Sequence, residues 1–246
     1  MVDLLNQYKD GLEVEMIMKR QSRFLWRQRG QLKLESSIIE EFLIKLMHPD
    51  IIQGLGDVTQ VVIGPAKTYM SMSFFPAGAG ELSEKGIEPV LKEKDMDFMI
   101  GKKVFYRFST SPEPVRKKAF SEGTFTVSLV AAECKTNLDK TMFQEAAGTA
   151  ARLKQGSPSA KYFLLVEYLD MVPEDPRSTE IDNVFLLRHA RRLNVDKRDV
   201  VEEVENQRRG FPIDHEVIWK FIQEIQAAVN ATWLDQSEVL RRGSFI

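Results

Sequence analysis

The 246-residue chain has one cysteine, almost no net charge and no long apolar run. A single cysteine excludes an intrachain disulfide framework and a cysteine-rich zinc site, and it is typical of a protein from a reducing compartment. No run approaches the roughly 20 apolar residues that cross a bilayer. The start of the chain, MVDLLNQYKD, also lacks the basic segment and apolar stretch of a signal peptide. We therefore expect a cytoplasmic protein that does not span a membrane.

The charges nearly cancel, because 34 basic and 36 acidic residues leave a net charge of −2. The sequence therefore has no overall basic character of the kind that marks many nucleic-acid-binding proteins. An enzyme that gathers acidic residues at a metal site and basic residues on a phosphate-facing surface would show the same balance. The three histidines are far apart and lack HExxH spacing, and residues 78–80 (GAG) lack the GK[ST] of a P-loop.

Residues 125–135 (FTVSLVAAECK) are the most informative stretch of the chain. They are rich in β-formers and apolar on both faces, which predicts a strand at the buried centre of a sheet. Side chains alternate along a strand, so Glu133 and Lys135 point to one face and Cys134 to the other. A carboxylate and an ammonium at the end of a buried strand are costly to desolvate. We interpret the pair as part of a divalent-metal site that activates water against a phosphodiester.

A magnesium site needs further oxygen ligands, since Mg²⁺ prefers oxygen and keeps several waters. The backbone carbonyl of Cys134 and a carboxylate from an upstream strand are the expected additions. Asp97 opens the segment DFMI much as Glu133 closes its own strand, and Asp95, expected on the same strand face, is the alternative. Lys135 would then orient or activate the attacking water. A solvated strand end with an ion pair explains many E-x-K triplets, but the apolar run before this one favours the metal site.

The length and a hydrophobic content of 43% suit a single α/β domain. We divide residues 1–246 into a helical N-terminal part (1–48), an α/β core (49–170) and a helical C-terminal part (171–246). A polar surface loop is expected at 76–94 and an irregular connection at 109–124. Expected strands cover residues 58–63, 68–75, 97–108 with a turn near Gly101, 125–135 and 161–169.

A helix is predicted for about residues 141–154, with Asn137 or Asp139 as its N-cap. It carries an alanine-rich face suited to close packing on a sheet, and residues 156–158 (GSP) end it. A strong strand, KYFLLVEYL, follows at 161–169. Strand, helix and strand in this order predict a right-handed crossover and a parallel strand pair.

Residues 17–34 contain six basic residues and no acidic residue. Lys19, Arg23 and Arg27 recur at helical spacing, and such a face suits phosphate contacts with DNA. A solvated helix face is the usual explanation of this pattern, but the length of the acid-free run favours DNA. Weaker basic patches lie at residues 116–118 (RKK) and at Arg188, Arg191 and Arg192.

Two segments, KDMDFMI (94–100) and AAECKTNLDKTMFQEA (131–146), carry a resemblance. The pattern D-(x)n-E-x-K, followed by a helix and a strand, resembles the PD-(D/E)xK nuclease superfamily over roughly residues 30–170. The two segments themselves resemble, more narrowly, the Bpu-type II restriction endonucleases, which cut short asymmetric DNA sites. The resemblance implies a mixed sheet flanked by helices. It also implies that Asp97 and Glu133 bind Mg²⁺ and that Lys135 is catalytic.

The sequence departs from the superfamily pattern at one position, because Met96 rather than proline precedes Asp97. This departure leaves the choice between Asp95 and Asp97 open. The superfamily often adds a glutamate from its first core helix, and Glu35 fits that role because it shares a helix face with Ile39. An ordinary capping or ion-paired glutamate explains Glu35 equally well.

The function implied by the resemblance is Mg²⁺-dependent, sequence-specific cutting of double-stranded DNA in a prokaryotic restriction–modification system. A cognate methyltransferase would protect the host DNA. One active site cuts one strand, so a double-strand break implies a homodimer or a heteromeric partner subunit. The alternatives are a repair or recombination nuclease of the same superfamily and a non-catalytic DNA-binding subunit.

Overall fold

The protein is described by a computed structural model that covers residues 1–19, 34–55, 61–76, 87–109 and 120–231. A five-stranded sheet forms its centre, in the order β1-β2-β3-β4-β5. The first three strands pair antiparallel, and β3, β4 and β5 pair in parallel. The mixed sheet flanked by helices confirms the predicted α/β fold class. The strands are β1 (Val61–Pro76), β2 (Ile87–Ser109), β3 (Phe120–Leu138), β4 (Lys161–Leu169) and β5 (Asn183–Leu186).

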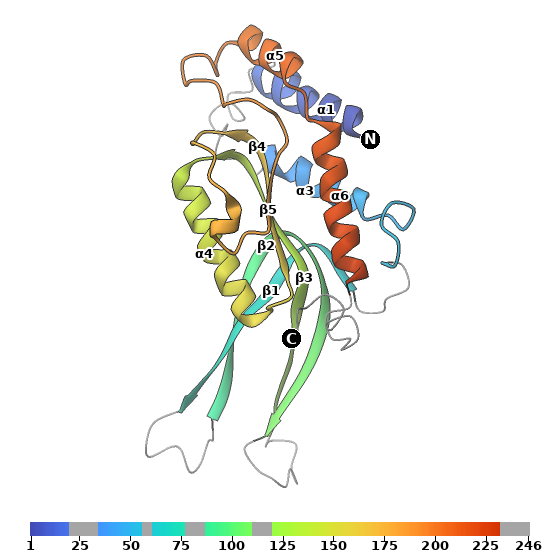
Figure 1. The fold of residues 1–246 in the computed structure, drawn as a ribbon, viewed down its shortest axis with the longest axis vertical. Helices are drawn as coiled ribbons and strands as arrows, with labels where there is room; N and C mark the ends of the chain where they lie inside the picture. Colours follow the sequence, from blue (N-terminus) through green and yellow to red (C-terminus); the bar gives the residue numbers. More distant parts are fainter. Residues whose placement is uncertain (20–33, 56–60, 77–86, 110–119, 232–246) are drawn as a thin grey trace, which may run out of the picture.

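The three antiparallel strands are much longer than expected and extend as arms beyond the helices (Figure 1). The strands predicted at 58–63 and 68–75 are one strand, β1, which continues past Gly64 in a positive-φ conformation of 113°. The turn predicted near Gly101 is wrong, because β2 runs through it with only a register shift between Ile100 and Gly101. Gly101 therefore marks an irregularity in the pairing of β2 with β3 and not a turn of the chain.

Two predicted loops are shorter than expected. Residues 87–94, expected in a loop, belong to β2, and β3 already begins at Phe120. This part of β2 contains exposed charged residues such as Lys92 and Glu93, so its sequence has the polar character of a loop. The remaining loop residues, 77–86 and 110–119, lie outside the described residues.

The predicted strand–helix–strand unit is confirmed. Helix α4 (Lys140–Gly156) joins β3 to β4, and β4 has the predicted bounds. Asp139 is the N-cap and accepts a hydrogen bond of 2.8 Å from the backbone N–H of Met142. Gly156 ends the helix against β1, where an added Cβ would lie 2.2 Å from the carbonyl oxygen of Met70. The close approach explains why glycine stands at this position.

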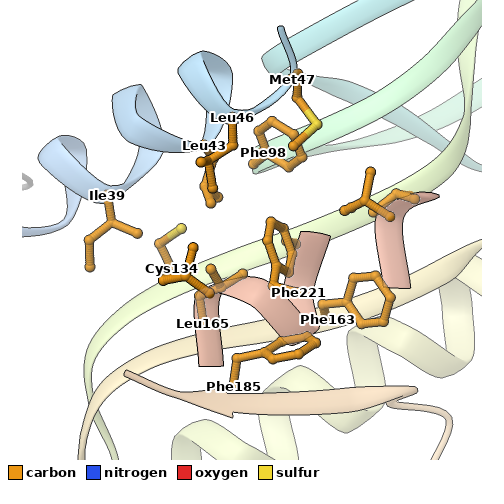
Figure 2. Packing of buried hydrophobic residues seen from close by; sticks show 14 of the residues in the cluster. Ile39, Leu43, Leu46, Met47, Phe98, Cys134, Phe163, Leu165, Phe185 and Phe221 are labelled. Atoms are coloured by element: carbon orange, nitrogen blue, oxygen red, sulfur yellow. The ribbon is translucent and has the colours of Figure 1, made fainter. Parts of the chain in front are cut away.

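Each face of the sheet has its own core. Helix α4 covers one face through Phe143, Ala146, Ala150 and Leu153. The opposite face packs against α1 (Val2–Asp10), α3 (Leu34–Leu46) and α6 (His215–Asn230). Figure 2 shows this second core, where side chains of α3 and the α6 residue Phe221 meet strand residues such as Phe98, Phe163 and Cys134. Both ends of the described chain thus complete one core.

The C-terminal part, expected to be mostly helical, also contains the short strand β5, which adds a fifth strand to the sheet. Its four residues were too few to recognise by alternation. A 3-10 turn, η3 (Pro176–Ser178), precedes β5, and α5 (Val201–Gly210) lies between β5 and α6. A π-helix, η1 (Gly11–Lys19), continues α1. Among the described residues, no helix is both long and apolar enough to cross a membrane.

Candidate active site

Glu133 and Lys135 lie near the end of β3 on the face covered by α4. The Lys135 ammonium is 2.8 Å from Glu133 Oε2, as expected for side chains two residues apart on a strand. The Glu133 residue is only 7% exposed. Between them, Cys134 points into the opposite core, where Figure 2 places it beside Ile39 and Leu165. The side chain of Cys134 therefore takes no part in the site.

Asp97 is brought to Glu133 by the pairing of β2 with β3. Phe98 pairs with Ala132, so Asp97 lies one residue further along towards Glu133. Its Oδ2 accepts a hydrogen bond of 3.0 Å from the backbone N–H of Cys134. The Asp97 carboxylate therefore lies against the backbone of β3 at the residue that follows Glu133.

Asp95 does not share the face expected for it. The residues on either side of it, Lys94 and Met96, both lie on the α4 face, since Lys94 contacts Thr149 and Met96 packs in the α4 core. Asp95 is exposed and points the other way. The reason is a register shift between β1 and β2 opposite residues 96–99, which interrupts the alternation between Asp95 and Asp97.

Two residues that the sequence did not single out complete the site. The hydroxyl of Tyr162, on β4, donates a hydrogen bond of 2.6 Å to Glu133 Oε1. The ammonium of Lys94, on β2, lies 3.4 Å from the same oxygen and donates a hydrogen bond of 3.1 Å to Thr149 Oγ1 of α4. Glu133 therefore has cationic or hydroxyl partners from three strands.

The surroundings keep the Glu133 carboxylate ionised. Burial alone raises its pKa, but the hydrogen bonds from Lys135 and Tyr162 and the positive charges of Lys135 and Lys94 lower that pKa below its ordinary value. Burial lowers the pKa of Lys135, yet its hydrogen bond to Glu133 and the negative charges of Glu133 and Asp97 raise it overall. Lys135 consequently retains its proton in this arrangement.

The donor set fits a hard divalent cation. Within the described part of the chain, no group of three or more His, Cys, Asp or Glu side chains could hold a metal ion. The two carboxylates of Asp97 and Glu133 nevertheless supply the oxygen donors that Mg²⁺ prefers, and this ion usually fills its other positions with water. The pair is therefore compatible with magnesium and not with a zinc site built from cysteine or histidine.

The other predicted site residues are less well placed. Lys19 forms ion pairs of 2.7 Å with both Glu15 and Glu205, while Arg23 and Arg27 lie outside the described residues. Glu35 belongs to α3, but its side chain is also outside the described part. The basic patch expected at residues 116–118 is not described either.

The position of Arg188 shows that the prediction of a DNA contact at this residue is wrong. It was a possible DNA contact, but it is fully buried and forms a 2.8 Å ion pair with Glu167. Its guanidinium also donates a hydrogen bond of 2.9 Å to the carbonyl of Phe211. A buried arginine with these partners is not available to bind a phosphate.

Comparison with known proteins places these features in a family. The chain is similar to a solved structure described as the native BbvCI A2B2 tetramer at low resolution, with a TM-score of 0.56 and 19% sequence identity. The match covers 93% of this chain and 85% of that chain, so it supports the fold. No curated protein sequence matches. The family described as Bpu10I restriction endonuclease matches residues 31–245, which is most of the chain. The chain therefore belongs to the Bpu10I restriction endonuclease family.

Proposed function

We propose that this nuclease is a type II restriction endonuclease that hydrolyses double-stranded DNA at specific sequences in a Mg²⁺-dependent reaction. Asp97 and Glu133 hold the metal ion, with the backbone carbonyl of Cys134 as a further ligand. Lys135 acts on the attacking water and the phosphate. The observation that carries the proposal is the hydrogen bond between Asp97 and the backbone of Cys134, the residue between the ion-paired Glu133 and Lys135.

The proposed reaction transfers a phosphoryl group to water. A water oxygen attacks phosphorus and gives up a proton to solvent, while the bond between phosphorus and the 3′ oxygen breaks. The leaving 3′ oxygen takes up a proton, so the products are a 5′-phosphate and a 3′-hydroxyl. When bound, Mg²⁺ supplies a Lewis acid that polarises the phosphate and makes the water easier to deprotonate.

Lys135 is better suited to orient the water than to deprotonate it. Glu133 and Asp97 raise the pKa of its ammonium, so it remains a cation at neutral pH. A fixed ammonium donates hydrogen bonds to a water or a phosphate oxygen and offsets the negative charge that develops in the transition state. Since its side chain is about one-third exposed, a phosphate can approach it from the surface.

A double-strand break requires two active sites or two successive cuts. The similar structure is named as an A2B2 tetramer, which contains two kinds of chain. By analogy, we propose that this chain assembles either with a second copy or with a different partner subunit. A cognate methyltransferase would protect the DNA of a prokaryotic host from the assembled enzyme.

The test is to incubate the purified protein with unmethylated phage DNA in Mg²⁺ and, in parallel, in EDTA. The proposal predicts discrete fragments in Mg²⁺ and intact DNA in EDTA. Nicked plasmid circles would indicate that a partner subunit supplies the second cut. A continuous smear, or binding without any cutting, would contradict site-specific cleavage by this chain.

A further inference from the structure

The candidate metal ligand Glu133 is held at one oxygen by two residues outside the Asp97–Glu133–Lys135 set. Tyr162 and Lys94 both contact Oε1, at 2.6 and 3.4 Å, whereas Lys135 contacts Oε2 at 2.8 Å. The two contacts to Oε1 differ in chemistry, because a phenol is neutral and an ammonium is a cation. They should therefore have opposite effects on a metal ion bound at the same carboxylate.

Tyr162 is suited to fix the direction of the carboxylate. Its ring is fully buried in the core beneath α4, so the position of its hydroxyl is set by packing. A carboxylate has about four lone-pair sites, so the hydrogen bond from Tyr162 leaves other sites on Glu133 open to a cation. Outer hydrogen bonds of this kind orient metal-binding side chains.

Lys94 is suited to compete with a metal ion. Its side chain is 39% exposed, and its ammonium reaches Glu133 across the gap between β2 and β3. Thr149 on α4 accepts a hydrogen bond from the same ammonium and holds it at the site. Because a nearby positive charge disfavours a second cation, Lys94 must weaken metal binding as long as it remains beside Oε1.

We propose that Tyr162 is a positioning residue for the metal ligand Glu133 and that Lys94 is a competing cation that sets how tightly the metal binds. The inference rests on the proposed function, since it takes Glu133 to be a metal ligand. Lys94 lies beside the carboxylate, 3.4 Å from Oε1. It moves off Oε1 when a divalent ion binds, while the hydrogen bond from Tyr162 is retained.

The experiment measures Mn²⁺ binding to the DNA-free protein from the loss of the free-ion electron paramagnetic resonance signal. Tyr162→Phe keeps the ring and should weaken Mn²⁺ binding by about 10-fold, the lower end of such outer-contact effects. Lys94→Met should tighten binding by about threefold or more, because a repelling charge is removed. Lys94→Arg, which restores the charge, should return the affinity towards that of the wild type.

Two matched controls separate these effects from general changes in packing or charge. Tyr168→Phe removes a hydroxyl from another buried tyrosine of β4, and Lys92→Met removes an exposed charge from the same strand as Lys94. Both should leave Mn²⁺ affinity unchanged. Unchanged affinity in Tyr162→Phe and Lys94→Met, or weaker binding in Lys94→Met, would overturn the inference.

The same titration distinguishes this inference from the proposed function. If the wild type binds Mn²⁺ and cuts DNA but neither variant shifts the affinity, the inference alone is wrong. If both shifts occur but the wild type never cuts DNA, the inference holds and the proposed cleavage is wrong. If Glu133→Gln binds Mn²⁺ as the wild type does, Glu133 is not a ligand and both fail.

Discussion

Glu133 and Glu167 lie on adjacent parallel strands, and each gathers cations around its carboxylate, but the two clusters differ in access. The two lysines at Glu133 have side chains that are 32% and 39% exposed. At Glu167 the carboxylate and Lys9 are fully buried, and the Arg188 side chain is 1% exposed. One cluster can be reached by a ligand from solvent, and the other is sealed.

The sealed cluster joins parts of the chain that are far apart in sequence. Glu167 lies 2.8 Å from the cationic groups of both Lys9 and Arg188, and Arg208 approaches its Oε1 at 3.7 Å. These residues come from β4, α1, the segment after β5, and α5. Arg208 also pairs with Glu13 and Asp10, which ties α5 to the N-terminal helices.

The comparison shows that a buried charge cluster is not by itself a functional site. A carboxylate enclosed by three cations has little capacity left for a ligand, and removal of the carboxylate takes a shared anion away from buried cations. Glu133 instead has cations that can turn towards water or a phosphate, and a second carboxylate, Asp97, beside it. Access and a neighbouring acid are therefore the two features on which the proposed function assigns a role to Glu133 and none to Glu167.

The largest expected effect is the loss of cleavage in Asp97→Ala. A bound metal ion provides several kcal/mol of transition-state stabilisation, so loss of one ligand should lower the cleavage rate by at least about 10³-fold. Asp95→Ala is the matched control and should cut normally, because Asp95 points away from Glu133. Single-turnover cleavage of a mapped DNA site measures both. Loss of activity in Asp95→Ala alone would show that the ligand is misassigned.

Lys135→Ala should also lose cleavage, by about 10²–10³-fold, which is typical when one group that stabilises transition-state charge is removed. Specific DNA binding in Ca²⁺ should remain close to that of the wild type, because Lys135 acts on the reacting atoms and not on the recognition sequence. Gel-shift and rate measurements on the same preparation test the two statements. Unchanged cutting would remove Lys135 from the mechanism.

Glu167→Gln should affect folding instead of chemistry. It leaves buried Arg188 without its carboxylate partner and Lys9 with Glu13 as its acidic partner, and breaking a buried pair in this way costs about 3–5 kcal/mol. Glu133→Gln should cost less, because its lysines are partly exposed. Urea unfolding gives the free energy of each variant. An equal or greater loss for Glu133→Gln would reverse the comparison.

The stability of the protein at acid pH should depend on the same Glu167 cluster. Burial raises the pKa of Glu167, but the charges of Lys9, Arg188 and Arg208 lower it below the ordinary 4.5. A group whose pKa is lowered by folding contributes stability above its unfolded pKa, and this stability is lost as the pH falls through the folded value. The unfolding free energy of the wild type should therefore drop below pH 4.5, and this part of the drop should be absent in Glu167→Gln.

The smallest effect is expected where an ion pair is fully open to solvent. Arg107 and Glu122 pair at 2.9 Å on the β2–β3 arm, with side chains more than 60% exposed. Such pairs contribute about 1 kcal/mol or less. Arg107→Ala should therefore change the unfolding free energy little, and high salt should mask even that change. A loss of unfolding free energy as large as that of Glu167→Gln would mean that solvent exposure does not determine how much these ion pairs contribute to stability.

The sequence predicted the parts of the molecule whose signals are local. The apolar run before Glu133, the capping residues at 137 and 139 and the apolar segment 161–169 each specify an element within a few residues, and the structure contains all three elements, with Asp139 as the cap. The length of β2 was missed because exposed charged residues such as Lys92 and Glu93 lie in its first half and leave no clear apolar pattern there. The four residues of β5 were too short to show a period.

Contacts between strands were harder to foresee. Tyr162 reaches Glu133 because Ala131 pairs with Tyr162 in the β3–β4 register, and the sequence of either strand alone does not give that register. Lys94 lies in a stretch expected to be a loop, so its position was not considered. Arg188 was misread as a surface base, because its partner Glu167 is 21 residues away in sequence. Side-chain pairing across the sheet requires the fold itself.

The central claim is that Asp97 and Glu133 hold a divalent metal ion. The most direct measurement is anomalous diffraction from crystals grown with Mn²⁺. The account predicts a peak about 2.0–2.2 Å from a carboxylate oxygen of each residue, within the usual range for small divalent ions, with the Lys94 ammonium displaced from Glu133 Oε1. A Mn²⁺ peak elsewhere, with the Lys94–Glu133 contact intact, would contradict it.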